Sequence, residues 1–484
     1  MNTAKNNAQR QQAQVAGKKT NYKNYIPFFI FISAMAFIIA KDIPIPKAII
    51  LPLGITGLIA LTFGSFFNPE SSLLLLTAYL PFSKMLVGRF DAQMVGINLT
   101  NILILIAALG WFANAHNTQK RMFTKSSLNP VVLIFCLWGF FALVRARFLY
   151  GDFYDFESFF ILFKRWVTPI FLYFIGLNMV RDRETFKKVM SVAMFVTFIV
   201  AFMAIRDYMN VGGGSLEESR VGGVFDQPNM LGAFFVYNMF FFLSFFLYYW
   251  RSLKYWLLFI PFLACLRGIM VTFSRGAYLA FGFGSLMSAF FRSKALFCIS
   301  LLLLIASLIN PVYLPEGMRE RLASTFGGEK VVSTNVEDIT DSSAGNRILI
   351  WKGAMEMIKA QPLFGYGYGM FPHVIGYFIP QMQDMDAHNT YLIIAAEMGI
   401  PALLIFLLIL CMLIKNAVWL LKHTEDRYFK AFAVGILGNI FGLMAANMFG
   451  SRLNSEEVSA YFWIYSGLLM RAVIMTRQRG KEYV

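Results

Sequence analysis

Long apolar runs recur along almost the whole chain, and short polar segments, many of them basic, separate them. Most runs approach or exceed the ~20 residues that a helix needs to cross the hydrocarbon core of a bilayer. The runs lie at residues 25–40, 48–67, 72–88, 99–114, 131–149, 163–180, 188–206, 225–249, 254–273, 277–291, 296–312, 391–414, 429–449 and 457–474. The pattern predicts an all-α polytopic integral membrane protein with about 12–14 transmembrane helices, the lower number if some short runs are re-entrant.

One long polar segment, from Pro311 to Thr390, interrupts the alternation of apolar runs and short polar segments. Loops longer than ~15 residues are usually functional or disordered. Residues 322–346 are expected to be mobile, whereas the stretch that starts at Arg347 ("RILIWKGAMEMIKAQPLFGYG") predicts an amphipathic helix. The chain should therefore divide into a disordered basic tail (1–24), a first helical bundle (25–312), a large loop with the amphipathic helix (313–390), C-terminal transmembrane helices (391–474) and a second tail (475–484).

Lys and Arg fall mainly in alternate short loops, among them 181–188, 251–254, 422–430 and 471–481. Basic loops stay on the cytoplasmic side of a membrane. We therefore expect both termini to be cytoplasmic and the large loop to lie on the outer, periplasmic face.

Composition agrees with a membrane protein, since 58% of the residues are hydrophobic and 14% are charged, against about 25% charged in soluble domains. The net charge of +16 follows from basic loops beside anionic lipid, so it does not indicate nucleic-acid binding. The four cysteines lie inside predicted spans without metal-ligand spacing, so neither a disulfide nor a zinc site is expected.

Four side chains on the predicted outer side are suited to phosphate chemistry, three of them at the ends of predicted spans and one, Arg347, in the large loop. Arg220 lies in "ESRVGGVFDQPN", Arg275 in "TFSRGAYL", Arg347 in "GNRILIWKG" and His388 in "DAHNTYL". The guanidinium group is a fixed fork of donors that matches phosphate oxygens, so the arginines could hold a diphosphate without a metal. A histidine with a pKa near ~6.5 can take a proton from an acceptor hydroxyl. Together they predict group transfer from a lipid diphosphate.

The motifs "GGVFDQPN", "TFSRGAYL", "RILIWKGAMEMIKAQPLFGYGYGMF" and "HNTYLIIAAEMGIPALL" resemble, in this order, signatures of the O-antigen ligase and polymerase superfamily of bacterial membrane glycosyltransferases. The resemblance covers roughly residues 205–450. It implies a GT-C-like fold in the bacterial inner membrane, with the active site on the periplasmic face. It also implies pyrophosphate binding by Arg220 and Arg347, less directly by Arg275, and catalysis by His388.

The resemblance further implies an undecaprenyl-diphosphate-linked glycan as donor, and a glycan or lipid A-core as acceptor, in the synthesis of lipopolysaccharide or exopolysaccharide. Neither a cofactor nor a metal is required, and a chain-length regulator protein is left open as a further partner. Polymerase and ligase differ only in the acceptor. The number of predicted spans and the extended N-terminal half favour a polymerase slightly.

Each candidate has a structural alternative. An arginine at the end of a span often reaches to lipid headgroups, and a loop histidine is often merely solvated. His373 could compete with His388 as the base. Asp384 and Asp386 form a DxD that could hold a cation.

Glu397 follows His388 by nine residues, which would place the two side chains on opposite faces of a continuous helix. We therefore expect Glu397 to pair with an arginine inside the bundle.

Two other classes of function stay open. A polysaccharide flippase or another transporter could have as many spans, and Arg165 and Arg267 could be its polar groups near the midplane. A non-catalytic membrane scaffold would explain the spans. The long outer loop and the Arg and His residues at one face favour an enzyme over both.

Overall fold

A computed structural model describes residues 62–64, 68–87, 99–117, 122–211, 219–310, 319 and 343–482. The predictions for the N-terminal tail, for the run at 25–40, for most of the run at 48–67 and for residues 322–342 lie outside the described residues. Within them every regular element is a helix. The expectation of an all-α polytopic membrane protein is confirmed.

The helices begin and end close to the predicted runs. Their bounds are α4 (Pro69–Tyr79), η2 (Leu80–Phe82), α5 (Ser83–Val87), α6 (Leu99–Asn117), α7 (Asn129–Tyr150), η4 (Gly151–Phe153), α8 (Phe156–Met179), α9 (Arg183–Asn210), η5 (Gly223–Phe225), α10 (Pro228–Asn238), α11 (Phe240–Tyr249), η6 (Leu253–Leu258), α12 (Phe259–Val271), α13 (Arg275–Arg292), α14 (Lys294–Ile309), α16 (Ser343–Ala360), α17 (Phe371–Phe378), η9 (Pro380–Met382), α18 (Thr390–His423), α19 (Arg427–Ala446), η10 (Arg452–Asn454) and α20 (Glu456–Glu482).

Nine helices within the described ranges are long and apolar enough to cross a membrane. The three other predicted runs within the described residues are not among these nine helices. The run at 72–88 is broken into α4, η2 and α5, and neither α13 nor α14 is among the nine. Since the first two runs lie mainly outside the described residues, the total of about 12–14 spans stays a prediction.

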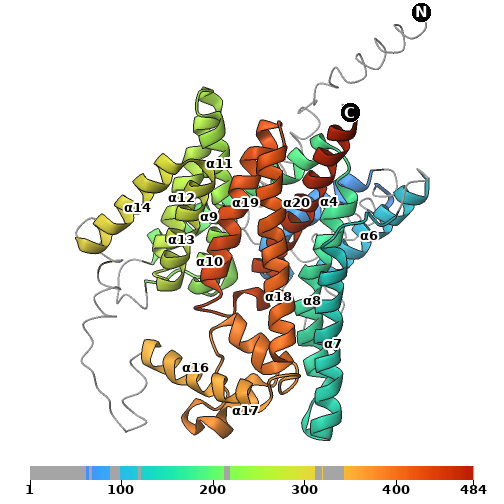
Figure 1. Ribbon diagram of the computed structural model, residues 1–484, viewed down its shortest axis with the longest axis vertical. Coiled ribbons are helices and arrows are strands. Elements are labelled where there is room, and N and C mark those ends of the chain that lie inside the picture. Colours follow the sequence, from blue (N-terminus) through green and yellow to red (C-terminus); the bar gives the residue numbers. More distant parts are fainter. Residues whose placement is uncertain are drawn as a thin grey trace, which may run out of the picture.

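The bundle is centred on α18, α19 and α20, with α9 to α14 on one side and α4 to α8 on the other (Figure 1). α20 packs along α8, and α19 packs against α11 and α13. Two small residues let α8 and α20 approach closely: a Cβ on Gly176 would lie 2.8 Å from the Ile464 carbonyl oxygen, and one on Gly467 would lie 2.3 Å from that of Tyr173. Small residues at crossings allow helices in membranes to pack backbone to backbone.

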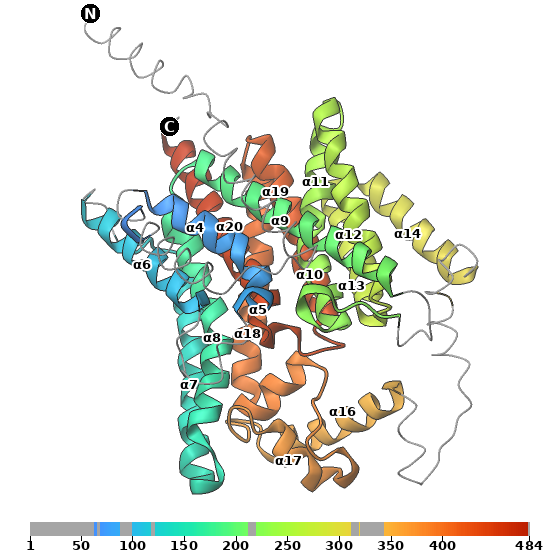
Figure 2. The same cartoon turned by 180° about the vertical axis from the view of Figure 1, so that it is seen from behind.

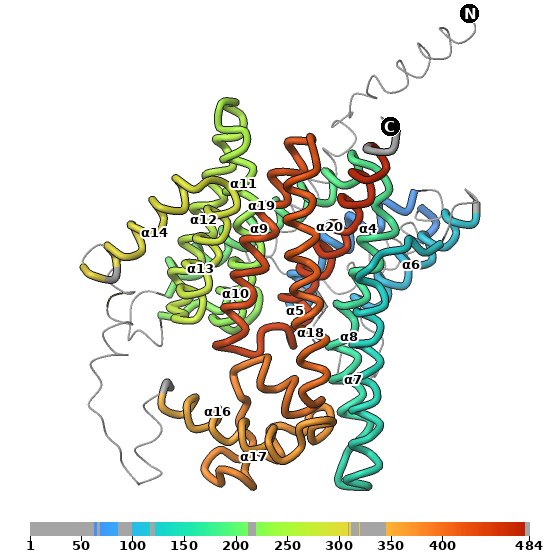
Figure 3. The backbone as a smooth tube through the Cα atoms, in the orientation of Figure 1, coloured from blue at the N-terminus to red at the C-terminus, as the bar shows by residue number. Residues whose placement is uncertain are grey.

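Successive helices run in alternate directions, so the chain separates two sets of loops. The ends that carry residues 181–183, 250–253, 292–294 and 423–427 lie at the top of Figure 1, beside the C-terminus. The segments 219–228, 272–275, 343–389 and 447–455 lie at the other end. The segment after α19 turns beneath the bundle, above α16 (Figure 3).

The layer formed by α16, α17 and η9 lies under this lower end (Figures 1 and 2). α16 includes the predicted amphipathic helix and ends at Ala360, before Pro362. Ile350, Ala354 and Met357 are buried on one face, whereas Lys352 is exposed on the other. This part of α16 therefore has one buried and one exposed face.

Candidate functional site

The segment after α9 holds Arg220 against the turn between α12 and α13. Arg220 donates from Nε to the Thr272 carbonyl and from Nη2 to Asn229 Oδ1, both at 3.2 Å. Asn229 Oδ1 also accepts the Ser274 hydroxyl at 2.8 Å. Asn229 lies in the first turn of α10 and Ser274 is the N-cap of α13. The guanidinium group is thus fixed where these two helices begin.

Arg275 is the first residue of α13. The chain reaches it through Phe273, whose φ of 47° is in the left-handed region that a bulky residue rarely adopts. The next residue, Gly276, lies so close to Phe449 that an added Cβ would be 3.2 Å from the Phe449 Cβ. The start of α13 therefore contacts the segment that follows α19.

α16 contributes Arg347 and Trp351, which lie one turn apart on the same face. The Trp351 indole donates from Nε1 to the carbonyl of Ala387 at 2.9 Å, and its ring centroid lies 6.3 Å from that of Phe449. This face of α16 is therefore turned toward the residue before His388 and toward the segment after α19.

His388 lies just before α18 in a left-handed conformation, with φ of 48°. Asp386 Oδ1 accepts the His388 backbone N–H at 3.1 Å and the Ser451 hydroxyl at 2.8 Å. The Asp386 Oδ2 atom lies 3.8 Å from His388 Nδ1, and the imidazole is about half exposed. Asn389 caps α18 by accepting two of its first backbone N–H groups. The imidazole is thus held at the water-facing start of α18, with Nδ1 toward a carboxylate.

The arginines of these segments influence one another. The pKa of Arg347 is lowered first by burial and then by the charges of Arg275 and Arg220. Within the described ranges Arg347 has no carboxylate or hydrogen-bond acceptor as partner. A buried positive charge beside like charges is unfavourable unless an anion joins it.

A fourth arginine, Arg452, belongs to the same cluster and was missed by the sequence reasoning. It lies in η10 and is 8% exposed. Burial lowers its pKa to about 10, and Arg347 and Arg220 act in the same direction. Its position in the sequence could have marked it as a candidate, because Arg452 lies in the short polar segment "GSRLNSEE" between the last two spans. We call Arg220, Arg275, Arg347 and Arg452 the arginine cluster.

Charges of the arginine cluster also affect the pKa of His388. Its pKa is lowered from the usual value first by burial, and Arg347 and Arg452 lower it further, whereas Asp386 raises it. The imidazole is therefore predominantly neutral at pH 7, which is the form that accepts a proton. The structure brings together all four residues that the sequence singled out, His388 and three arginines.

His373 and the DxD motif are arranged differently from the predicted alternatives. The two aspartates have separate partners. Asp384 Oδ1 lies 3.5 Å from His373 Nδ1 on α17, whereas Asp386 Oδ2 lies beside His388 Nδ1. His373 and Asp384 are both largely exposed. In the described parts of the chain no three His, Cys, Asp or Glu residues form a group that could hold a metal ion.

The expectation that Glu397 pairs with an arginine is wrong. Its carboxylate accepts the backbone N–H groups of Gly369 at 2.9 Å and Phe371 at 3.0 Å, and among the described residues it has no arginine partner. α18 begins at Thr390, so the assumed continuous helix from His388 is also wrong. Glu397 anchors the loop between α16 and α17, because a buried carboxylate satisfies two backbone donors at once.

Glycines with positive φ shape this loop and its contact with α18. Gly365 has a φ of 62°, and an added Cβ there would lie 2.4 Å from the backbone carbonyl carbon of Glu397. Gly399 has a φ of 84° and interrupts α18, and a Cβ there would be 2.2 Å from the Leu363 carbonyl oxygen. Arg145 of α7 donates to the Gly365 carbonyl at 2.7 Å. The loop is thereby clamped between α7 and α18, and it supports the layer that carries α16.

Arg267, which the sequence offered as a transporter residue, is exposed near the end of α12, and its guanidinium lies 5.0 Å from the Tyr208 ring centroid. It therefore does not face the interior of the bundle.

A scan against protein-family models matches residues 260–407 to the family described as O-antigen ligase. The matched stretch contains Arg275, Arg347 and His388 and ends within α18. The match confirms the resemblance to the O-antigen ligase and polymerase superfamily. A search of the curated proteins gives no match to the chain.

Proposed function

We propose that this protein, whose central segment matches the O-antigen ligase family, is a membrane glycosyltransferase that moves an undecaprenyl-diphosphate-linked oligosaccharide to an acceptor hydroxyl. One observation carries the proposal: four arginines from four segments converge beside a predominantly neutral histidine. A cluster of this kind suits an anion with more than one negative charge, placed next to a proton acceptor.

The arginine cluster is proposed to bind the diphosphate of the donor. Arg347 and Arg452 are partly desolvated and repel each other, so a dianion between them would gain strong charge-assisted hydrogen bonds. During transfer the bond between the sugar C1 and the phosphate oxygen breaks, and the electron pair stays on the diphosphate. The same guanidinium groups would stabilise the charge that develops on this leaving group.

His388 is proposed to be the general base for the acceptor. The acceptor hydroxyl oxygen forms the new bond to C1, and its proton goes to the imidazole. Because Nδ1 lies toward the Asp386 carboxylate, the proton on a neutral ring is favoured at Nδ1, which leaves Nε2 as the acceptor atom. Asp386 would then position the ring and stabilise the imidazolium that forms.

A transporter would be expected to keep its charged groups near the middle of the bundle. In this molecule the arginine cluster lies in the loops at one end, next to α16. This placement supports an enzyme that works at a membrane surface. The Lys and Arg pattern supports assignment of that end to the periplasmic face of the bacterial inner membrane, with both termini cytoplasmic.

Within this reaction we favour a polymerase, which joins the lipid-linked glycan to another lipid-linked repeat. The description of the matched family favours a ligase, which passes the glycan to lipid A-core. Analysis of surface glycan from a deletion strain separates them. Chains of a single repeat are expected for a polymerase, and accumulated long lipid-linked chains for a ligase. Surface glycan of unchanged length and amount would contradict both.

A further inference from the structure

Residues 447–455 lead from α19 to α20 at the end of the bundle that carries the arginine cluster (Figure 3). The buried Asn447 fixes the beginning of this segment. Its side chain accepts the Thr390 hydroxyl at 2.6 Å and donates to the Tyr237 hydroxyl at 2.7 Å, and its backbone carbonyl accepts the Thr390 N–H at 3.0 Å. Because Thr390 is the first residue of α18, the segment is tied to the start of that helix and to α10.

The middle of the segment is held in the same way. The Gly450 carbonyl also accepts the Thr390 hydroxyl, at 3.2 Å. A Cβ on Gly450 would clash with the guanidinium group of Arg452, which donates from Nη2 to the Phe449 carbonyl at 3.4 Å. The Arg452 side chain is therefore folded back over its own segment, and Gly450 leaves the space for it.

Ser451 lies between these two anchored positions and is buried. Its hydroxyl donates to Asp386 Oδ1 at 2.8 Å, and the same oxygen accepts the His388 backbone N–H at 3.1 Å. Two donors on one oxygen restrict rotation of the carboxylate. The other oxygen, Oδ2, is thereby kept on the side of the imidazole, 3.8 Å from His388 Nδ1.

A serine in a loop between two helices can also serve the fold alone. Ser455 is an example from the same segment, because its hydroxyl donates to Glu457 Oε2 at 2.8 Å in the first turn of α20. Ser451 makes the same kind of hydrogen bond to a different carboxylate, the one that faces the imidazole. A base whose orienting group is itself held by a further donor is a recurring arrangement in active sites.

We propose that Ser451 is a positioning residue for the base, because its hydroxyl holds the Asp386 carboxylate in the orientation that pairs with His388. This inference rests on the proposed function, in which His388 is the base. Ser451 takes no part in the transfer itself. Since Arg452 is the next residue, the same short segment also sets the distance between the base and part of the arginine cluster.

The consequence for His388 follows from the charges around it. Asp386 raises its pKa, whereas Arg347 of α16 and Arg452 of η10 lower it. In Ser451→Ala the carboxylate loses one of the two donors on Oδ1, so it can turn away from the ring and stabilise the imidazolium less. The pKa of His388 should therefore fall, by less than in Asp386→Asn.

The first test measures this pKa without any transfer reaction. Full-length protein in detergent is labelled with ¹³C at Cε1 of its four histidines, and each signal is followed by NMR as the pH changes. The His388 signal is the one that is missing in His388→Gln. Ser455→Ala is the matched control, since it removes a hydrogen bond from a hydroxyl to a carboxylate in the same segment, and the pKa of His388 should not move in it. Ser451→Thr keeps a hydroxyl and should keep the wild-type pKa, so it serves as the test if Ser451→Ala does not fold.

The second test measures transfer in proteoliposomes. Ser451→Ala should lower kcat about two- to tenfold, the effect of one hydrogen bond, with the KM for donor within twofold of the wild type. The acid limb of its kcat/KM profile should move to lower pH, because this limb reports the pKa of the base in the free enzyme. In an Asp386→Asn background Ser451→Ala should cause no further shift, since two residues that act through one contact are not additive.

Three results would overturn the proposal: an unmoved His388 pKa in Ser451→Ala or a lowered one in Ser451→Thr, an equal shift in Ser455→Ala, or an additional shift in the Asp386→Asn background. A raised KM for donor with an unmoved His388 pKa would also overturn it, because Ser451 would then serve only the placement of Arg452. Failure of the proposed function is recognised separately. In that case His388→Gln would transfer at the normal rate, whatever Ser451→Ala does to the pKa.

Discussion

Arg347 offers the sharpest test of the arginine cluster, because its loss should harm activity without harming the fold. It is partly buried, lies beside two other arginines, and has no partner within the described part of the chain. Arg347→Gln therefore breaks no ion pair seen in the structure. It also removes repulsion from Arg275 and Arg220, so the thermal midpoint of the purified protein should stay the same or rise.

The expected loss of activity follows from the contacts with a phosphate. One hydrogen bond to a charged group contributes about 1.5–3 kcal/mol, which corresponds to about 10–150-fold in kcat/KM. A bidentate contact would double the free energy, so the loss should lie between about tenfold and 10⁴-fold. Arg347→Lys should recover only part of this loss, because an ammonium group cannot reproduce the planar fork.

The assay measures transfer from a lipid-diphosphate glycan in proteoliposomes, with the thermal midpoint recorded for each variant. Lys352→Gln is the matched control, since it removes a positive charge from the exposed face of the same helix, and it should be within twofold of the wild type. A stable Arg347→Gln protein with wild-type kcat/KM would refute the reasoning, and would indicate an arginine that only reaches to lipid headgroups.

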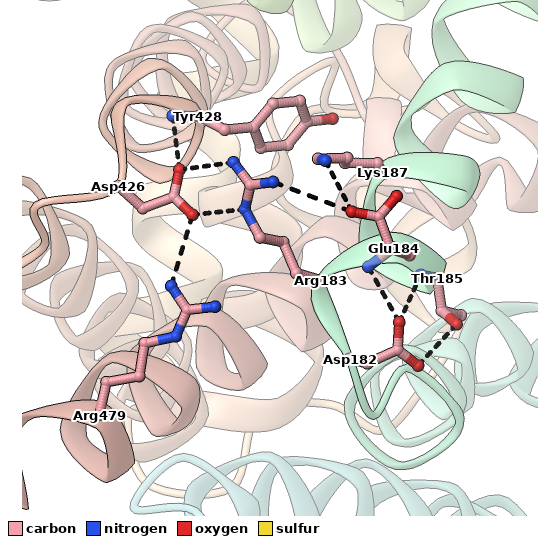
Figure 4. Close-up of polar contacts among 8 residues, drawn as sticks. All are labelled: Asp182, Arg183, Glu184, Thr185, Lys187, Asp426, Tyr428 and Arg479. Carbon is pink, nitrogen blue, oxygen red and sulfur yellow. Dashed lines mark hydrogen bonds and ion pairs between the residues drawn. The ribbon is translucent and has the colours of Figure 1, made fainter. Parts of the chain in front are cut away.

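Three further predictions concern single carboxylates and the proposed base. His388→Gln should bind donor nearly normally but transfer about 10²–10⁴-fold more slowly, and a variant with a normal turnover rate would sink the assignment. Asp386→Asn removes the group that raises the His388 pKa, so the acid limb of the kcat/KM profile should move to lower pH, and an unmoved limb would argue against the pairing. The pKa of Asp426 is lowered overall, because hydrogen bonding and charge from Arg183 outweigh the opposing effect of burial. The ion pair of Asp426 with Arg183 (Figure 4) should stabilise the protein fully at pH values above ~3.9, the usual pKa of an unfolded Asp. This stabilisation should be lost as the pH falls through the lower pKa that Asp426 has in the folded protein. Asp426→Asn should therefore lower the thermal midpoint at pH 7, by the equivalent of about 3–5 kcal/mol for a broken buried pair, and should have little effect below that folded pKa.

The spans were predictable because a bilayer demands a long apolar run for every crossing. Three of the four arginines were predictable as candidates, because a charge beside an apolar run is rare enough to be noticed, but Arg452 was missed. The convergence of the arginines in space was not predictable, because it depends on contacts between segments that are distant in the sequence. Trp351 with Ala387 and Ser451 with Asp386 are examples.

One wrong prediction and one alternative that the sequence left open have physical explanations. Glu397 was assigned an arginine partner because a buried charge needs a counterpart, but two backbone N–H groups satisfy it instead. The DxD motif suggested a shared cation, although neighbouring residues with different backbone conformations can point in different directions. Asp384 has a φ of 62°, and its carboxylate turns to His373 rather than to the site.

The central claim is tested most directly with purified protein in proteoliposomes, supplied with an undecaprenyl-diphosphate-linked repeat unit, with lipid A-core as a second possible acceptor, and treated with a metal chelator. Two products are measured together: free undecaprenyl diphosphate, and glycan extended by one repeat or joined to lipid A-core. The account predicts equal amounts of the two products, undiminished by chelator, and loss of both in the Arg347→Gln and His388→Gln proteins. Transfer that stops with chelator and returns with added metal, or that persists unchanged in both variants, would contradict it.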